Sequence, residues 1–378
     1  MKKLFSSIGT YLRRSDTLLL ALCVLATIYG TVLIASCTGG FGSSSVRVQL
    51  LAMVIGIVVY FVFSMIDVDI LAGNWIILYM ASIGLLLALL RFGVAEGSNR
   101  AWIRFWGIGI QPAELGKIAF IIIMARCISK YSEERKLNNV LRLGFLLFIF
   151  ASYFGLIIVI SSDLGSALVY MFIFAAMLFA GGLKIYWFLI ALTVAIIASP
   201  YLWEYLLRDD QRNRIIALFA PDTVDPTGLG ITMQVRRSRA AIASGRIFGM
   251  GLGNGTMTQA EMVPRQRTDF IFSVAGEELG FVGCVLLVAL LTAIVVRVVF
   301  VGMKCQSRLG ALVAVGVAAM MSFQILMNLG MCLGVAPVVG LTLPFFSSGG
   351  SSIVTSFAAM GMVSGLRMKP KTTLFNQY

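Results

Sequence analysis

Carboxylates and arginines are the side chains of this sequence that could carry out acid–base chemistry on a charged substrate. The 378-residue chain contains no histidine, which removes the commonest general base and the commonest metal ligand. Proton transfer therefore falls to aspartate, glutamate, lysine or tyrosine. Asp269 is the leading candidate for a general base because it lies between a basic stretch and a long apolar run. Burial at that boundary should raise the pKa of Asp269, whereas Arg265 and Arg267 should lower it.

Arginines are concentrated in residues 207–270, which contain nine of them and no lysine. Planar guanidinium groups suit bidentate binding of phosphate, so this concentration predicts a ligand that carries phosphate. Attraction to anionic lipid headgroups is the alternative explanation. The arginines that we select as candidate phosphate ligands are Arg212, Arg214, Arg236 and Arg246.

Charged and polar side chains also interrupt the apolar sequence in residues 97–117. Glu114 and Lys117 are three residues apart, which places them on one helical face where they can pair. A charged pair in apolar surroundings is costly, and this favours a functional site; a structural ion pair that fixes one helix is the alternative. The candidate substrate contacts from this stretch are Arg100, Trp102, Gln111, Glu114 and Lys117.

Three shorter stretches complete the set of candidate residues. Asp163 is expected to cap the helix that follows it, or else to hold an arginine of residues 207–270. Residues 333–352 are too rich in proline, glycine and serine for a continuous helix, so they form either an outer loop or a re-entrant segment that lines a cavity. Glutamates within an apolar helix must face protein or water. The candidates are Asp163, Thr268, Glu277, Glu278, Ser347, Gly349, Gly350, Ser351 and Ser352.

The elements that must position these residues are membrane helices. The chain is 59% hydrophobic and 12% charged, whereas soluble domains are about 45–50% apolar and about 25% charged, so we predict an all-α integral membrane protein. Residues 207–270 form one large extracytoplasmic loop within a single polytopic membrane domain, 1–378. The predicted membrane segments are 17–36, 46–66, 70–90, 115–128, 142–160, 164–182, 184–206, 271–301, 309–333 and 349–366.

Lysine and arginine in the short connections set the orientation. With the N-terminus inside, the inner connections hold fifteen of them and the short outer ones only four, so both termini are expected to be cytoplasmic. The candidate site then lies on the extracytoplasmic side. The six cysteines have no CxxC spacing, and we predict no metal ligands and no required cofactor.

Five motifs, in this order, resemble the SEDS family of membrane proteins, whose name stands for shape, elongation, division and sporulation. The resemblance runs from about Thr17 to Arg367. QRNRI and the short N-terminus favour RodA-like elongation members over FtsW-like division members, although QPAE and GLGNG recur in the latter. The motifs are NRAWI…QPAELGK, SDLGSA, QRNRI, VPRQRTDFIFSVAGEELGFVG and NLGMCLGVAPVVGLTLPFFSSGGSS.

The resemblance implies a ten-helix protein of the bacterial plasma membrane that polymerises lipid II, the undecaprenyl-pyrophosphate-linked disaccharide-peptide, into peptidoglycan strands. Asp269 matches the family's essential aspartate, and we expect it to be the general base while loop arginines hold the pyrophosphate. A divalent cation, Mg²⁺ or Mn²⁺, would fit on the pyrophosphate. The implied partners are a class B penicillin-binding transpeptidase and other elongasome or divisome membrane proteins, with no nucleic acid. The sequence departs from the family pattern at Ser162, Arg265, Arg267 and Ser348.

Two other functions use the same features. In a transporter or flippase of lipid-linked precursors, Glu114, Lys117 and Glu277 would line a translocation path. The sequence shows no inverted repeat with paired broken helices, which counts against this alternative. A non-catalytic scaffold for a partner's wall-synthesis enzyme would use the same helices without chemistry of its own.

Overall fold

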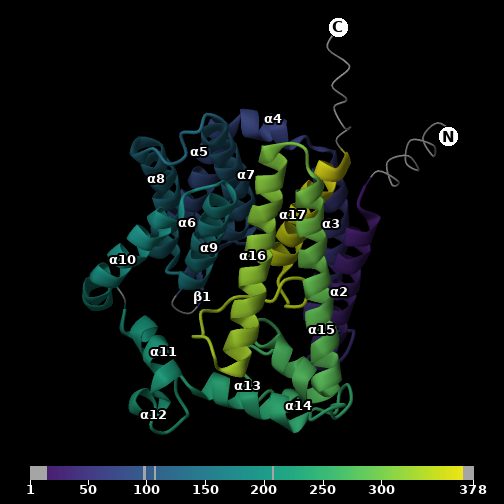
Figure 1. Ribbon diagram of the computed structural model, residues 1–378. Helices are drawn as coiled ribbons and strands as arrows, with labels where there is room; N and C mark the ends of the chain where they lie inside the picture. The colour runs from purple at the N-terminus through teal and green to yellow at the C-terminus, as the bar shows by residue number, and fades with distance from the viewer. Residues whose placement is uncertain (1–14, 97–98, 106–107, 207, 369–378) are drawn as a thin grey trace, which may run out of the picture.

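The computed structural model is a bundle of long apolar helices and describes residues 15–96, 99–105, 108–206 and 208–368 (Figure 1). Six spans in these residues are long and apolar enough to cross a membrane: α2 (Thr17–Ser36), α3 (Ser44–Met65), α5–α6 (Trp75–Phe92), α8 with the π-helical η1 (Val140–Ser161), α15 (Ile271–Lys304) and α16 (Arg308–Leu333). Two shorter apolar helices and two further long helices join them: α9 (Leu164–Ala180), α10 (Ile185–Tyr201), α7 (Pro112–Glu133) and α17 (Gly350–Met368). These ten elements correspond to the ten predicted segments.

The third predicted segment, 70–90, is interrupted. Asn74 leaves helical geometry at φ −99° and ψ 31°, and its side chain donates to the Ile70 carbonyl, so a short helix α4 (Val68–Gly73) ends there. The span then restarts as α5 (Trp75–Leu87) and α6 (Leu89–Phe92). Asparagine competes for backbone hydrogen bonds in this way more often than it continues a helix.

The fourth predicted segment, 115–128, is longer than expected. Helix α7 has 22 residues, starts with Pro112 at its first turn, and is buried along most of its length. Averaged hydropathy understates how deeply this helix is buried. The charges of Glu114 and Lys117 lower the average, although the two side chains neutralise each other inside the protein. The segment is therefore a central helix of the bundle rather than a short, partly interfacial one.

A small antiparallel sheet, which the sequence analysis did not anticipate, precedes α7. It contains β1 (Gly93–Glu96), β2 (Asn99–Phe105) and β3 (Ile108–Ile110) in the order β1-β2-β3. Val94 pairs with Trp102, and Ile103 pairs with Ile110. The strands are short and belong to a connection, so their alternating pattern was too brief to stand out from the apolar helices around them.

Short helices make up about half of the predicted loop 207–270 and lie across the lower end of the bundle in Figure 1. Gly280 interrupts α15 with φ 65°, and the glycine-rich loop (residues 247–255) packs against this kink. The amides of Phe281 and Val282 donate to the carbonyls of Arg246 and Ile247, which ties the loop to the helix. The elements of this region are η2 (Leu202–Leu206), α11 (Asp209–Phe219), α12 (Pro221–Val224), α13 (Met233–Ser244) and α14 (Thr256–Gln259).

Candidate active site

Asp269 lies at the base of α15, where the 207–270 region meets the helix bundle. Its carboxylate is nearly buried and accepts a hydrogen bond from Arg265, with 3.3 Å between Nη1 and Oδ2. Asn328 of α16 donates to the Asp269 carbonyl at 2.8 Å and to the Leu341 carbonyl at 2.7 Å. One amide therefore fixes the backbone of Asp269 relative to both α16 and the segment that follows it.

Opposing influences act on the Asp269 carboxyl, as the sequence analysis predicted. Burial raises the pKa of Asp269 above the ordinary range, and this is the largest contribution. The Arg265 guanidinium lowers that pKa through its charge and its hydrogen bond, and Thr268 and Arg214 lower it further. The result is a carboxylate with a raised pKa that stays within reach of a cation, which suits a proton acceptor.

A cavity of about 670 Å³ is lined by Arg265, the hydrogen-bond partner of Asp269, and by the adjacent Thr268, and we call it the arginine cavity. Three guanidinium-bearing residues from two distant parts of the chain line it: Arg104 comes from β2, and Arg265 and Arg267 come from the turn before α15. Three cations around one cavity form a strong site for an anion with several oxygens. The remaining lining residues are Ser45, Val48, Thr268, Ser348, Gly349 and Gly350.

The segment between α16 and α17 forms one wall of the arginine cavity. It contains no helix over residues 334–349, as predicted. The Ser348 amide donates to the Arg267 carbonyl at 2.8 Å, and the Ser347 hydroxyl donates to the Thr268 carbonyl. The Leu343 amide in turn donates to Ser347. These bonds hold the irregular backbone against the turn that carries Asp269, so the interpretation as a segment lining a cavity is supported.

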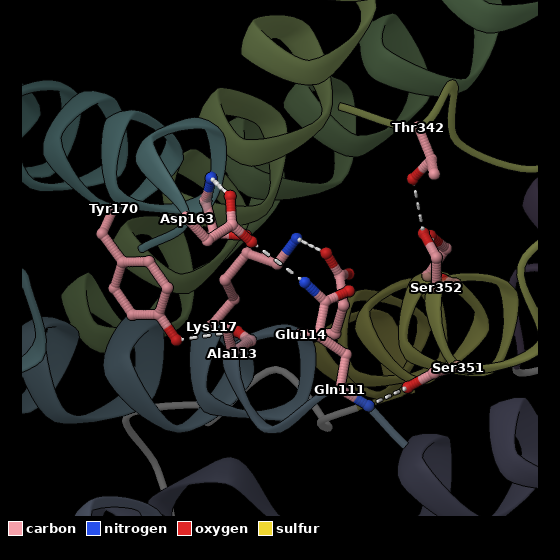
Figure 2. A network of polar contacts seen from close by, with 11 residues as sticks. Gln111, Ala113, Glu114, Lys117, Asp163, Tyr170, Thr342, Ser351 and Ser352 are labelled. Atoms are coloured by element: carbon pink, nitrogen blue, oxygen red, sulfur yellow. Dashed lines mark hydrogen bonds and ion pairs between the residues drawn. The ribbon is translucent and has the colours of Figure 1, made fainter. Parts of the chain in front are cut away.

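A second group of candidate residues forms a buried polar network between α7, α9 and the start of α17 (Figure 2). Lys117 and Glu114 form an ion pair at 2.6 Å, and both are buried. The Gln111 side-chain amide donates to Asp163 at 3.1 Å, and its backbone amide donates to the Ser351 hydroxyl at 3.3 Å. The predicted pairing of Glu114 with Lys117 is confirmed, and the network brings three separate motifs together.

Asp163 takes the capping role. It accepts from the Ser166 amide at 3.0 Å and from the Ser166 hydroxyl at 2.7 Å, which satisfies the first turn of α9. Its other described hydrogen bond comes from Gln111. The capping prediction is therefore confirmed, whereas the alternative that Asp163 holds an arginine of residues 207–270 stays a prediction.

Glu277 and Glu278 face protein, as predicted, and both are fully buried. Glu277 accepts from the amides of Met257 and Thr258 at 2.8 Å and 2.9 Å. Glu278 accepts from Ser36 and from the Gln259 side chain. Both carboxylates therefore hold α14 and the glycine-rich loop against α15. Direct contact of either glutamate with substrate stays a prediction.

The four loop arginines selected from sequence do not line the arginine cavity. Arg214 and Arg236 line a second cavity of about 400 Å³, where Arg214 donates to the Val338 carbonyl and Arg236 pairs with Asp222. Arg212 donates to the Glu204 carbonyl, and Arg246 lines an apolar groove against α15. Their role as phosphate ligands stays a prediction.

The remaining candidates are Trp102, Arg100 and Ser352. Trp102 packs over Gly109, where a β-carbon would come within 3.1 Å of its ring. Arg100 is in β2, and its side chain lies outside what the structure describes. Ser352 shares a hydrogen bond with Thr342 at 3.2 Å.

Several cavity residues escaped the sequence analysis as ligands. Arg265 and Arg267 were noted only for their effect on Asp269, although their position next to it was a usable signal. Arg104 was used only as one of the four basic residues of the short outer connections that predicted the membrane orientation. Asn328, which is outside the cavity lining, is one of two side-chain amides in an apolar helix, and this was its only signal.

Metal ligands do not gather in the described residues, which contain no group of three or more Cys, Asp or Glu side chains able to hold an ion. A divalent cation would therefore depend mainly on oxygens of the substrate. Its involvement stays a prediction.

Comparison with known proteins decides the family. Residues 16–372 match the model of the FtsW, RodA and SpoVE proteins, described as cell cycle proteins. The chain belongs to this SEDS family. It is 32% identical over 359 residues to the peptidoglycan glycosyltransferase MrdB of Escherichia coli K12, covering 94% of each chain. It is also 32% identical over 374 residues to a probable peptidoglycan glycosyltransferase FtsW of Trichlorobacter lovleyi, covering 94% of this chain and 95% of that one.

Solved structures of SEDS proteins share the fold. A chain from a peptidoglycan synthase complex that coordinates polymerization and crosslinking superposes with a TM-score of 0.79 and 29% identity, over 93% of this chain and 97% of that one. The rod shape determining protein RodA of Thermus thermophilus gives a TM-score of 0.67 and 27% identity, over 93% and 96%. This SEDS protein is therefore a multi-pass membrane protein with the family's ten-helix fold.

Proposed function

We propose that this SEDS peptidoglycan glycosyltransferase polymerises lipid II, with Asp269 as its general base. The observation that carries the proposal is that Asp269 is buried and hydrogen-bonded to Arg265, which lines a cavity together with two other arginines. A base and a polycationic pocket side by side are what transfer from a pyrophosphate donor requires. The similar proteins include a rod shape determining protein, and the family model describes cell cycle proteins, which supports a role in wall synthesis for elongation or division.

The reaction needs one proton acceptor and a stabilised leaving group. The acceptor sugar's 4-hydroxyl oxygen bonds to the anomeric carbon of the donor sugar, and its proton passes to the Asp269 carboxylate. The bond between that carbon and the pyrophosphate oxygen breaks, and its electron pair leaves with undecaprenyl pyrophosphate. Arg104, Arg265 and Arg267 would stabilise the developing charge on the phosphates. Pyrophosphate is a good leaving group, so no second carboxylate is needed as an acid.

The membrane orientation and the partner follow from the same proposal. Lipid-linked precursors are polymerised outside the cytoplasm, so the end of the bundle that carries Asp269 faces outward and both termini face the cytoplasm. The density of lysine and arginine in the other connections supports this orientation. The similarity to a chain of a peptidoglycan synthase complex supports a transpeptidase of the penicillin-binding class as partner.

Purified protein supplied with lipid II tests the proposal. Glycan products resolved by size should form a ladder of polymers. Movement of lipid II across vesicles without polymer would instead indicate a flippase. A protein that yields polymer only through the enzyme of a partner would be a scaffold. Parallel reactions with Mg²⁺, with Mn²⁺ and with a chelator test the predicted cation.

A further inference from the structure

A basic pocket lies at the opposite end of α7 from the polar network. Helix α7 has 22 residues, so its last turn is about 33 Å from Gln111 and far from the proposed chemistry. The pocket has a volume of about 580 Å³ and lies where α7 ends and α8 begins. Its lining residues are Tyr131, Lys136, Asn139, Leu141, Arg142 and Phe145.

The connection between the two helices is ordered rather than loose. The Lys136 amide donates to the Tyr131 carbonyl at 2.7 Å, which closes the last turn of α7. Asn139 caps α8 by accepting from the Leu141 amide at 2.9 Å. The Arg142 guanidinium lies over the Tyr131 ring, 5.0 Å from its centroid. These contacts hold the Arg142 guanidinium over the Tyr131 ring and fix the backbone from which the Lys136 side chain extends.

Positive charge dominates this corner of the protein. Lys130, Arg135, Lys136 and Arg142 are opposed there by Glu133 and Glu134. Lys136 pairs with Glu134 at 3.3 Å, but the lysine side chain is 55% exposed. Exposed pairs contribute about 0–1 kcal/mol, so an incoming anion can displace Glu134 from Lys136.

Apolar side chains begin at the rim of the pocket and continue along α8. Leu141 is 82% exposed and Phe148 is 64% exposed, although both belong to a membrane-spanning helix. Such exposure on a span marks the surface that faces lipid tails. The two cations thus lie where charged headgroups meet acyl chains, the position at which basic pockets between helices recognise anionic lipids.

We propose that this pocket binds the phosphate headgroup of an anionic phospholipid, whose acyl chains follow the exposed face of α8. Lys136 and Arg142 would hold the phosphate oxygens, with Arg142 oriented by Tyr131. The combination of two cations with adjacent lipid-facing side chains favours a lipid over a soluble phosphate. The pocket is independent of the lipid II site, so this proposal stands apart from the proposed function.

Native mass spectrometry of the full chain released from detergent tests the proposal. Dioleoyl phosphatidylglycerol should remain bound more often than dioleoyl phosphatidylcholine at equal concentration. Arg142→Gln and Lys136→Gln should each lower the phosphatidylglycerol occupancy about five-fold, because one basic residue at an anionic surface contributes about 1 kcal/mol. Arg142→Lys keeps the charge and should retain more lipid than Arg142→Gln.

The matched control is Lys304→Gln, which removes an exposed charge at the same end of the bundle but outside the pocket. It should leave lipid occupancy unchanged. Equal retention of both lipids, or equal losses in the control and the pocket variants, would overturn the proposal. Competition by glycerol 3-phosphate at the same concentration as the lipid would also overturn it and indicate a soluble ligand. Unchanged thermal unfolding of the variants separates lost binding from lost folding.

Discussion

Arg265 donates to the carboxylate of Asp269 from one turn away, and the two side chains differ sharply in exposure: 62% for the arginine and 8% for the aspartate. The cation is therefore on the open side of the pair, facing the cavity, while the base is held against the protein. Substrate phosphate that binds Arg265 would draw the guanidinium away from Asp269. The arrangement links occupancy of the cavity to the basicity of the carboxylate.

Replacement of the proposed base is the first prediction. Asp269→Asn should lower the polymerisation rate by about 10²–10⁴-fold, because asparagine keeps the shape but accepts no proton. Folding should survive, since the Asn328 contact is to the Asp269 backbone. Glycan yield at matched protein concentration measures the effect. Asp209→Asn, at an exposed position in the same region, is the control and should stay active. Full polymer yield from Asp269→Asn would refute the assignment.

The pH dependence of turnover is the second prediction. A base must be deprotonated to work, so kcat/KM should fall as the pH drops through the pKa of Asp269. Burial raises that pKa, which places the acid limb above the ordinary carboxyl range. Arg265→Gln removes the strongest lowering influence, so the acid limb should move to still higher pH. Profiles of kcat/KM, which report the free enzyme in which Arg265 still contacts Asp269, measure this shift. An unmoved acid limb in Arg265→Gln would argue against Asp269 as the titrating group.

Loss of cavity cations is the third prediction. Arg104→Gln and Arg267→Gln should each raise the KM for lipid II at least about tenfold, because a hydrogen bond to a charged group contributes about 1.5–3 kcal/mol. Arg237→Gln is the control, since Arg237 donates to the Met262 carbonyl and lines neither the arginine cavity nor the second cavity that contains Arg214 and Arg236. Equal changes in the control would contradict the cavity assignment. Arg236→Gln tests separately whether the second cavity also binds substrate.

The fourth prediction concerns Asn328, a positioning residue. Asn328→Ala removes the donor shared by the carbonyls of Asp269 and Leu341 and should lower kcat about tenfold with little change in KM. Gln324→Ala, one turn earlier on α16 and also buried, controls for the cavity that the truncation creates. Steady-state kinetics distinguish them: a KM effect without a kcat effect would show that Asn328 does not position the base. The acid limb of the pH profile should stay in place.

The buried ion pair supplies the fifth prediction. Glu114→Gln or Lys117→Met alone leaves an unpaired buried charge and should destabilise the protein by about 3–5 kcal/mol. Thermal unfolding in detergent should then recover when both residues are replaced. If the pair contributes to the substrate site, the double variant should remain inactive despite its recovered stability, and we expect this result. An active, stable double variant would make the pair purely structural.

Local features of the sequence determined much of this protein. Composition and run length established the helical membrane class, because a span needs only consecutive apolar residues. The Glu114–Lys117 pair and the Asp163 cap were predictable because helical geometry alone brings residues three apart together. The opposing influences on Asp269 were equally local, since Arg265 is four residues away.

Only the tertiary structure determined which residues come together at the site. Asn328 reaches Asp269 across 59 residues of sequence, and Gln111 reaches Ser351 across 240. Arg104 comes from a small sheet that the sequence analysis did not anticipate, whereas Arg214 and Arg236, which were selected from the sequence, line a different cavity. The number of arginines predicts affinity for phosphate, but it does not show which cavity each guanidinium group will line. The packing of α15, α16 and the irregular segment before α17 sets which guanidinium groups meet at Asp269, because those contacts depend on the whole bundle.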